Sequence, residues 1–172
     1  FPRFFFLADE QMLEILSQTK EPRAVQPHLG KCFEGLNMIK FEKDLKITQM
    51  ISGEGERVDL NSPVDPESTA NKGNVERWLL ELENLQWESV RRQVELSLEE
   101  YPTMERTAWT LNWPAQAVIA TSAIFWTKDV NKTIETGGYA ALNEYVLDLN
   151  KQLTSIVMLV RGQLSKLQRK TL

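Results

Sequence analysis

The stretch FPRFFFLADEQMLEILSQTKEPRAVQPHLGKCFEGL, residues Phe1 to Leu36, decides how the beginning of the chain is expected to fold. Its run Phe4–Leu7 has the apolar density of a buried strand or extended segment. Asp9 then suits a helix N-cap, and apolar residues follow it at helical spacing. Pro22 and Pro27 interrupt that pattern, because proline is poorly tolerated inside a helix. These residues are therefore predicted to form an extended lead-in followed by two short helices, with a break near Lys20 and a restart at Val25.

A strand pattern follows at residues 38–60, where apolar residues alternate with polar ones. Gly53 and Gly55 lie within this pattern and suit the positive φ of a tight turn, so one β-hairpin is predicted. A glycine-rich turn can instead hold phosphate, but the glutamates beside these glycines would repel it. Residues 61–73, rich in proline, asparagine and glycine, are predicted to be a connecting loop.

A long helix is predicted directly after this loop. Asn74 is a suitable N-cap, and Pro102 is expected to end the helix. Its apolar positions recur in steps of three or four, with one step of five that rotates the apolar face. These positions are Val75, Trp78, Leu79, Leu82, Leu85, Val90, Val94, Leu98 and Tyr101.

Two more long helices are predicted after an irregular stretch at residues 103–113. Pro114 suits the first turn of the earlier one, and Gly137–Gly138 are expected to end it. Its predicted apolar stripe is Ile119, Ala123, Trp126, Val130 and Ile134, with Val118, Ser122 and Phe125 beside it. The last helix, at residues 139–170, has the spacing of an antiparallel bundle or coiled-coil seam. The row expected to be buried against the preceding long helices is Leu149, Leu153, Ile156 and Val160.

These patterns predict a mainly α fold in a single segment, residues 1–172. An elongated bundle of long antiparallel helices is expected at residues 74–172, with one small β-hairpin at residues 38–60. The hydrophobic content of 42% is enough for a core. The net charge is −4 and the basic residues are scattered, which argues against a nucleic-acid partner. No apolar run reaches about 18 residues, so no membrane partner is expected.

Four stretches of this sequence resemble the linker region of dynein heavy chains, and more closely the axonemal branch than the cytoplasmic one. The first is residues 1–36, quoted above, and it is the most specific. The others are ISGEGERVDL at 51–60, NKGNVERWLLELE at 71–83 and RGQLSKLQRKTL at 161–172. They follow one another in the expected order, and the resemblance covers essentially the whole chain.

The resemblance implies a mechanical function. Dynein linkers are arches of helical bundles that lie across a ring of AAA+ modules, and they bend and straighten with the nucleotide cycle. This chain resembles the central to ring-proximal part of such a linker. Its implied partners are the AAA+ ring of the same heavy chain and, through the parent motor, a microtubule-based assembly with other dynein chains. The implied location is the cytoskeleton, in the axoneme of a cilium or flagellum. ATP and Mg²⁺ would act in the parent motor.

Residues that carry chemistry are sparse. His28 and Cys32 lie four residues apart on a predicted helix, but they are the only histidine and the only cysteine, so packing is favoured over a metal site. The pairs of adjacent carboxylates are typical of solvated helix faces. The P-loop pattern GxxxxGK[ST] is missing from the sequence. No catalytic, cofactor or metal site is therefore expected in this segment, and no hydrolysis of ATP by it.

The five tryptophans are the remaining unusual feature. Trp78 and Trp126 lie on apolar stripes and are predicted to be core residues. Trp87 lies off the main stripe of its helix, and Trp109 and Trp113 lie in the irregular stretch, so each is a candidate either for the core or for an interface with a partner. A different class of function also stays open: a helical adaptor or coiled-coil module that binds a partner through its last helix. An enzyme is the weakest alternative.

Overall fold

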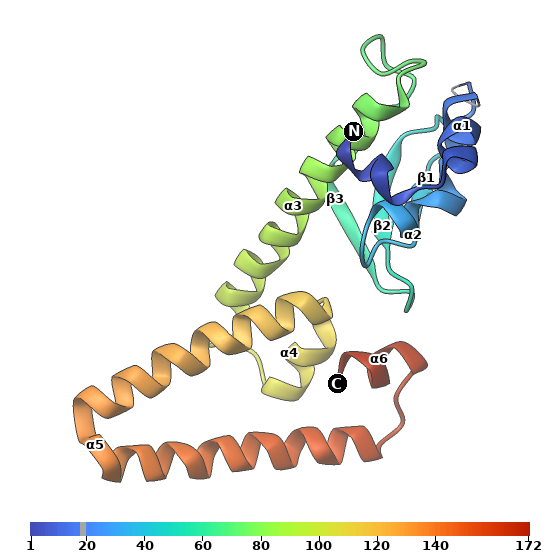
Figure 1. Ribbon diagram of the computed structural model, residues 1–172. Helices are drawn as coiled ribbons and strands as arrows, with labels where there is room; N and C mark the ends of the chain where they lie inside the picture. The colour runs from blue at the N-terminus through green and yellow to red at the C-terminus, as the bar shows by residue number, and fades with distance from the viewer. Residues whose placement is uncertain (18–19) are drawn as a thin grey trace. The chain divides into compact units, whose positions relative to one another are not determined.

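The computed structural model describes residues 1–17 and 20–172 (Figure 1). This part of the chain is mainly helical and contains a small antiparallel sheet, which confirms the predicted helical class. Its residues group into two compact units, the N-terminal unit Phe1–Arg91 and the C-terminal unit Arg92–Leu172. Helix α3 (Val75–Glu100) contributes residues to both.

Four short helical elements begin the N-terminal unit: η1 (Pro2–Phe6), α1 (Asp9–Ser17), η2 (Pro22–His28) and α2 (Leu29–Cys32). The prediction of an extended lead-in was wrong, because η1 is a 3-10 helix that begins at Pro2, where the fixed φ of proline suits a first helical turn. Phe4 is buried while Phe5 and Phe6 are exposed. Asp9 lies inside the first turn of α1 and does not cap it, although its charge suits that end of the helix.

The prolines of the second helical stretch lie within a helix, whereas the sequence pattern had predicted that they interrupt one. Pro22 begins η2, and the side chain of Glu21 accepts a hydrogen bond from the Arg23 N–H at 3.2 Å. Pro27 lies inside η2. The predicted restart at Val25 was therefore wrong, because a short 3-10 helix tolerates the missing N–H of proline better than an α-helix does. The break predicted near Lys20 borders residues 18–19, which lie outside the described residues.

The sheet is a meander of β1 (Met38–Phe41), β2 (Ile47–Ile51) and β3 (Arg57–Val64), paired antiparallel in that order. The predicted single hairpin thus missed one turn, at residues 42–46. Leu45 has φ 67° in that turn, a conformation that leucine rarely adopts, so no glycine or asparagine marked the turn in the sequence. The predicted turn between β2 and β3 is present, and Gly55 supplies its positive φ of 93°.

The side chain of Gln26 takes the place of a neighbouring strand at the edge of β1. Its Nε2 donates to the carbonyl oxygen of Ile39 at 2.6 Å, and its Oε1 accepts from the N–H of Ile39 at 3.0 Å. Both backbone groups of an edge residue are thereby satisfied. This pair of hydrogen bonds connects η2 to the sheet.

The predicted loop at residues 61–73 is shorter than expected, because β3 continues to Val64. The buried side chain of Asn71 anchors the remaining turns. Its Nδ2 donates to the carbonyl oxygen of Asp65 at 3.0 Å and to a carboxylate oxygen of Glu81 at 2.8 Å. The connector is therefore bonded to α3.

The core of the N-terminal unit is formed by the short helices, the sheet and the first part of α3. Asn74 caps α3 as predicted, since its Oδ1 accepts from the N–H of Arg77 at 3.1 Å. Arg3 on η1 donates to Glu83 on α3 at 2.8 Å. The predicted apolar face of α3 is confirmed in this part, where its buried members are Val75, Trp78, Leu79, Leu82 and Leu85.

The C-terminal unit contains the end of α3 and the helices α4 (Arg106–Asn112), α5 (Ala115–Arg161) and α6 (Lys166–Thr171). The predicted irregular stretch thus contains a helix, capped by Glu105, whose carboxylate accepts from the N–H groups of Thr107 and Ala108. Pro114 is the N-cap of α5 and not its first helical residue. The last predicted helix ends earlier than expected, and a capping box at Ser165 begins α6.

A glycine pair reverses the direction of α5, as the sequence predicted for the end of that helix. Gly138 has φ 56° and ψ −138°, a conformation essentially restricted to glycine. A Cβ on Gly137 would lie 2.5 Å from the Cβ of Ala141. Figure 1 shows the chain turning back at this point into two arms, residues 115–137 and 139–161.

The predicted apolar stripes of the two arms are not buried as expected. On the first arm the buried side is formed by Ala117, Val118 and Thr121, whereas Ile119, Trp126 and Ile134 are exposed. The prediction that Trp126 is a core residue was therefore wrong. On the second arm Leu153 is 59% exposed and Val160 39%, while Leu149 and Ile156 are half-buried. The predicted burial of this row was wrong for Leu153 and Val160. Whether the long helices form an extended bundle stays a prediction.

Candidate binding sites and interaction surfaces

Arg106 lies among aromatic side chains in the C-terminal unit. Its Cζ is 4.6 Å from the centroid of the Trp109 ring and 5.1 Å from that of the Tyr101 ring, within cation–π range. Its Nη2 donates to the hydroxyl of Ser122 at 2.8 Å. Its Nη1 is buried and has no hydrogen-bond partner among the described residues. The guanidinium is thus held in place with one donor unused.

Buried hydrogen bonds and ring contacts fix this aromatic cluster. The Tyr101 ring meets Trp109 edge to face at 4.9 Å and stacks on Phe125 at 4.2 Å. The indole N–H of Trp109 donates to the carbonyl oxygen of Ser97 at 3.2 Å. The hydroxyl of Ser97 shares a buried hydrogen bond with that of Thr121. These contacts join the end of α3, α4 and the first arm of α5.

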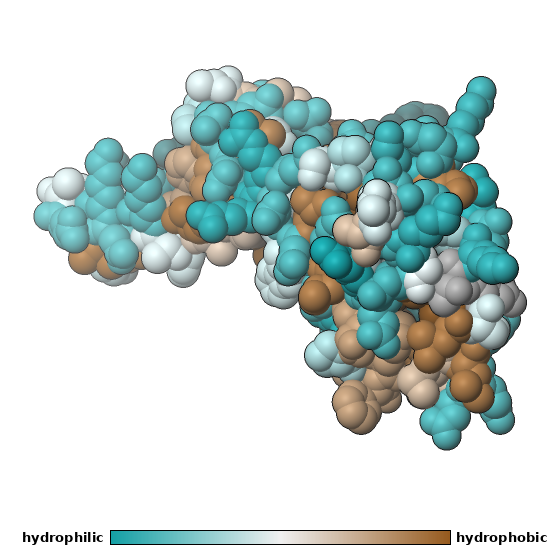
Figure 2. Space-filling view, turned by 90° about the horizontal axis from the view of Figure 1, so that it is seen from above, coloured by the Kyte–Doolittle hydropathy of each residue, from teal (hydrophilic) through white to brown (hydrophobic). Residues whose placement is uncertain are grey.

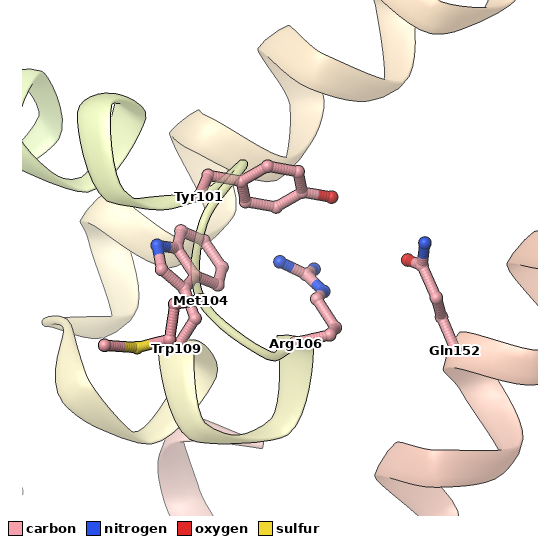
Figure 3. Close-up of a pocket in the computed structure, with 5 residues that line it drawn as sticks. All are labelled: Tyr101, Met104, Arg106, Trp109 and Gln152. Atoms are coloured by element: carbon pink, nitrogen blue, oxygen red, sulfur yellow. The ribbon is translucent and has the colours of Figure 1, made fainter.

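A pocket of about 220 Å³ opens beside the guanidinium (Figure 3). Figure 3 shows the guanidinium between the aromatic rings on one side and the carboxamide of Gln152, which extends toward it, on the other. The lining residues are Tyr101, Met104, Arg106, Trp109 and Gln152. Sequence reasoning did not identify this site, because Gln152 comes from the second arm of α5 and only the glycine reversal brings it near α4.

The second arm is also close to the first at Tyr145. Burial raises the pKa of the Tyr145 hydroxyl, and the nearby Asp129 and Tyr101 raise it further. Asp129 lies on the first arm, so this environment is a second sign that the arms fold back on each other.

The three candidate interface tryptophans have different environments. Trp87 on α3 is 71% exposed. Trp109 is fully buried in the aromatic cluster, as the first of its two predicted alternatives, a core position, requires. Trp113 is half-buried, and its indole N–H donates to the carboxylate of Glu100 at 2.6 Å. Contact of any of them with a partner stays a prediction.

Apolar side chains are also exposed along both arms of α5. Figure 2 shows brown hydrophobic residues at several places on one face of the molecule, among teal hydrophilic ones. Large patches of exposed apolar side chains are typical of surfaces that contact another protein. On α5 the exposed large apolar residues are Ile119, Ile124, Trp126, Ile134, Tyr139, Val146, Leu147, Leu153, Val157, Met158 and Val160.

His28 and Cys32 are both buried in the N-terminal unit. The Nε2 atom of His28 lies 3.4 Å from a carboxylate oxygen of Glu14, and neither ring nitrogen makes a hydrogen bond. Burial raises the pKa of the Cys32 thiol, an effect that the nearby Arg3 partly offsets. A buried thiol of this kind is chemically unreactive. Packing is therefore the role that the geometry supports for this pair.

Among the residues that the structure describes, no group of three or more His, Cys, Asp or Glu side chains is arranged to hold a metal ion. None of the described helices combines the length and the apolar character needed to cross a membrane.

The family model "Dynein heavy chain, N-terminal region 2" matches residues 1–97. Over all 172 residues the chain is 49% identical to Dynein axonemal heavy chain 1 of Mus musculus and 47% identical to Dynein axonemal heavy chain 12 of the same species. Identity to Dynein axonemal heavy chain 3 of Homo sapiens is 44%. The chain spans only 4% of the length of the first and third relatives and 6% of the second. These 172 residues therefore belong to the dynein heavy chain family, as part of the N-terminal region of an axonemal-type heavy chain.

Proposed function

We propose that this chain is a mechanical linker segment, which couples the ATP cycle of an AAA+ ring in the same heavy chain to displacement along microtubules. Family membership over the whole chain is the observation that carries the proposal. The resemblance to the central to ring-proximal part of a linker supports this position within the heavy chain. The partners would be the ring and, through the parent motor, an axonemal assembly of a cilium or flagellum.

The helices suit a load-bearing role. Helix α3 has 26 residues, and α5 has 47 with one reversal at Gly138. A continuous helix transmits force through hydrogen bonds arranged along its axis, and it bends where that continuity is interrupted. The candidate interruptions are the turns that follow β3, the segment between α3 and α5, and the Gly137–Gly138 reversal. Of these, the first is bonded to α3 through Asn71.

ATP and Mg²⁺ would act in other parts of the heavy chain. This segment carries no P-loop lysine or the serine or threonine that follows it, the groups that hold phosphates and magnesium. The exposed apolar residues of α5 support contacts with neighbouring parts of the parent protein. The segment would thus transmit the movement that the ATP cycle of the ring produces, without taking part in ATP hydrolysis.

The test uses a full heavy chain that carries Gly138→Ala, with Gly53→Ala as the matched control. Alanine at Gly138 strains the reversal of α5, whereas a Cβ at Gly53 meets no atom within 4 Å and its φ is not positive. We expect ATP hydrolysis to persist and microtubule gliding to slow in the first variant only. Unchanged gliding in a variant with a shown local destabilisation, or a strictly proportional loss of hydrolysis and gliding, would rule out the linker role.

The exposed apolar residues of the second arm also favour a second candidate, a helical adaptor that pairs with a partner in trans. The two candidates differ in solution behaviour. An adaptor of this type should self-associate through Leu153 and its apolar neighbours, and Leu153→Glu should abolish the association. Sedimentation velocity measures this directly, and a monomer over the full concentration range would exclude self-pairing.

A further inference from the structure

We propose that the pocket beside Arg106 holds the carboxylate of an aspartate or glutamate that lies in the same heavy chain, outside these 172 residues. The proposal uses the geometry of the C-terminal unit and does not depend on the linker function. Its starting point is the guanidinium, which has an unused buried donor and no carboxylate partner among the described residues.

The charge of the Arg106 guanidinium has no neutralising group among the described residues. Two aromatic faces and one hydroxyl stabilise the Arg106 charge, but none of them neutralises it. Buried N–H groups without an acceptor are rare in proteins and require an explanation, and a bound anionic group is one. Glu100 and Glu105, the carboxylates nearest in sequence, are bonded elsewhere, to Trp113 and to the first turn of α4 respectively.

The pocket lining selects the kind of anion. The Nη1 of Arg106 provides one donor, and the carboxamide of Gln152 can provide a second from the opposite wall. With the Gln152 carboxamide turned so that its nitrogen faces the guanidinium, one donor on each wall would suit the two oxygens of a carboxylate. The rings of Tyr101 and Trp109 and the side chain of Met104 would pack against the methylene groups of an acidic side chain.

Size and charge argue against a nucleotide. The volume of about 220 Å³ is below the range of about 300–1,000 Å³ that is typical of small-molecule sites. The lining contains a single cation, whereas a polyphosphate is normally held by several donors or by a metal. One side chain is therefore the ligand that fits.

The covalent connection favours the same heavy chain as the source. The related heavy chains are long enough that this segment covers only 4% of one of them. Binding within one chain is intramolecular, so a single ion pair in a small pocket can be occupied without high intrinsic affinity where the tether spans the distance.

The experiment is hydrogen–deuterium exchange on the full heavy chain with Arg106→Met, and with Arg92→Met as the matched control. Arg92 belongs to the same unit but is exposed and lies 3.8 Å from Glu95. We expect Arg106→Met to increase exchange several-fold in an acid-containing peptide outside residues 1–172, and Arg92→Met to leave that peptide unchanged. Gln152→Met, which keeps the Arg106 cluster, should produce a weaker increase in the same peptide.

A charge reversal completes the test. Arg106→Glu combined with an acid-to-arginine substitution in the responding peptide should restore wild-type exchange there. Changes confined to the C-terminal unit in both Arg106→Met and Gln152→Met would overturn the proposal and leave Arg106 with a structural role. A response in a different polypeptide, or in a peptide without aspartate or glutamate, would overturn it as well.

Discussion

The two compact units of this chain are stabilised in different ways. Among the residues that the structure describes, the short helices, the sheet and α3 of the N-terminal unit enclose one continuous apolar core of sixteen residues. In the described part of the C-terminal unit only three apolar residues, Trp109, Ala117 and Val118, are buried, and the cluster around them is rich in hydroxyl and aromatic groups. Similar helical periodicity in the sequence can therefore produce a closed core in one unit and largely exposed arms in another.

The largest difference in the free energy of unfolding should appear when one leucine of each unit is truncated to alanine. Leu82 is fully buried in the N-terminal core, so Leu82→Ala should lower the free energy of unfolding by about 2–5 kcal/mol. Leu153 is 59% exposed, so Leu153→Ala should change it by about 0.5 kcal/mol or less. Denaturant unfolding of the 172-residue chain measures both. A large loss for Leu153→Ala would mean that the second arm is buried as the sequence pattern predicted.

The next effect tests the reversal of α5. Gly138→Ala should destabilise the C-terminal unit by about 1–3 kcal/mol, because its φ of 56° and ψ of −138° are strained for any residue with a Cβ. Gly53→Ala should be nearly neutral, since a Cβ there meets no neighbour. Native-state hydrogen exchange reports the two units separately. Equal protection of the second arm in both variants would show that the reversal does not need glycine.

A smaller effect tests the hydroxyl pair in the core of the C-terminal unit. Ser97→Ala should cost about 1–2 kcal/mol, because it leaves the buried Thr121 hydroxyl without its partner. Thr121→Val should cost less, since Ser97 still donates to the carbonyl oxygen of Val94. The double variant should cost less than the sum of the two single ones. Strict additivity in a double-mutant cycle would mean that the two hydroxyls do not interact.

The smallest effect is on pH dependence and concerns the cap of α4. Hydrogen bonds from the Thr107 hydroxyl and from the N–H groups of Ala108 and Thr107 lower the pKa of Glu105. A carboxyl whose pKa is lower in the folded state stabilises that state above its unfolded pKa, about 4.3, and this contribution is lost as the pH falls through the folded value. Fluorine NMR of 5-fluorotryptophan at Trp109 should therefore show α4 loosening on acidification below that pH.

A matched pair of variants isolates this cap. Glu105→Gln should remove most of the acid response at Trp109. Glu42→Gln should leave it unchanged, because Glu42 belongs to the N-terminal unit, where hydrogen bonds from Lys40 and Thr48 lower its pKa. If the acid response at Trp109 persists in Glu105→Gln, another carboxyl group causes it.

Much of this protein was determined by the sequence itself, wherever a local signal and the burial of side chains agreed. The cap at Asn74, the apolar face of α3 from Val75 to Leu85, the turn at Gly55 and the break at Gly137–Gly138 could all be predicted. Each depends on a property of one residue or one helix turn, such as a side-chain acceptor, a missing Cβ or a 3.6-residue period. The family resemblance also followed from the sequence, through four stretches that are specific as a set and occur in the expected order.

The tertiary structure alone decided which apolar faces are covered. Apolar spacing shows that a helix has an apolar face, but burial needs a neighbour, and the positions of neighbours depend on turns elsewhere in the chain. Leu45 adopts a left-handed conformation in a turn that no glycine or asparagine marked, and this turn divides the first arm of the predicted hairpin into two strands, so the sheet has three. The reversal at Gly138 brought Gln152 beside Arg106 and left Leu153 exposed. The pocket could not be read from the sequence, because its members share no local pattern and meet only through long-range packing.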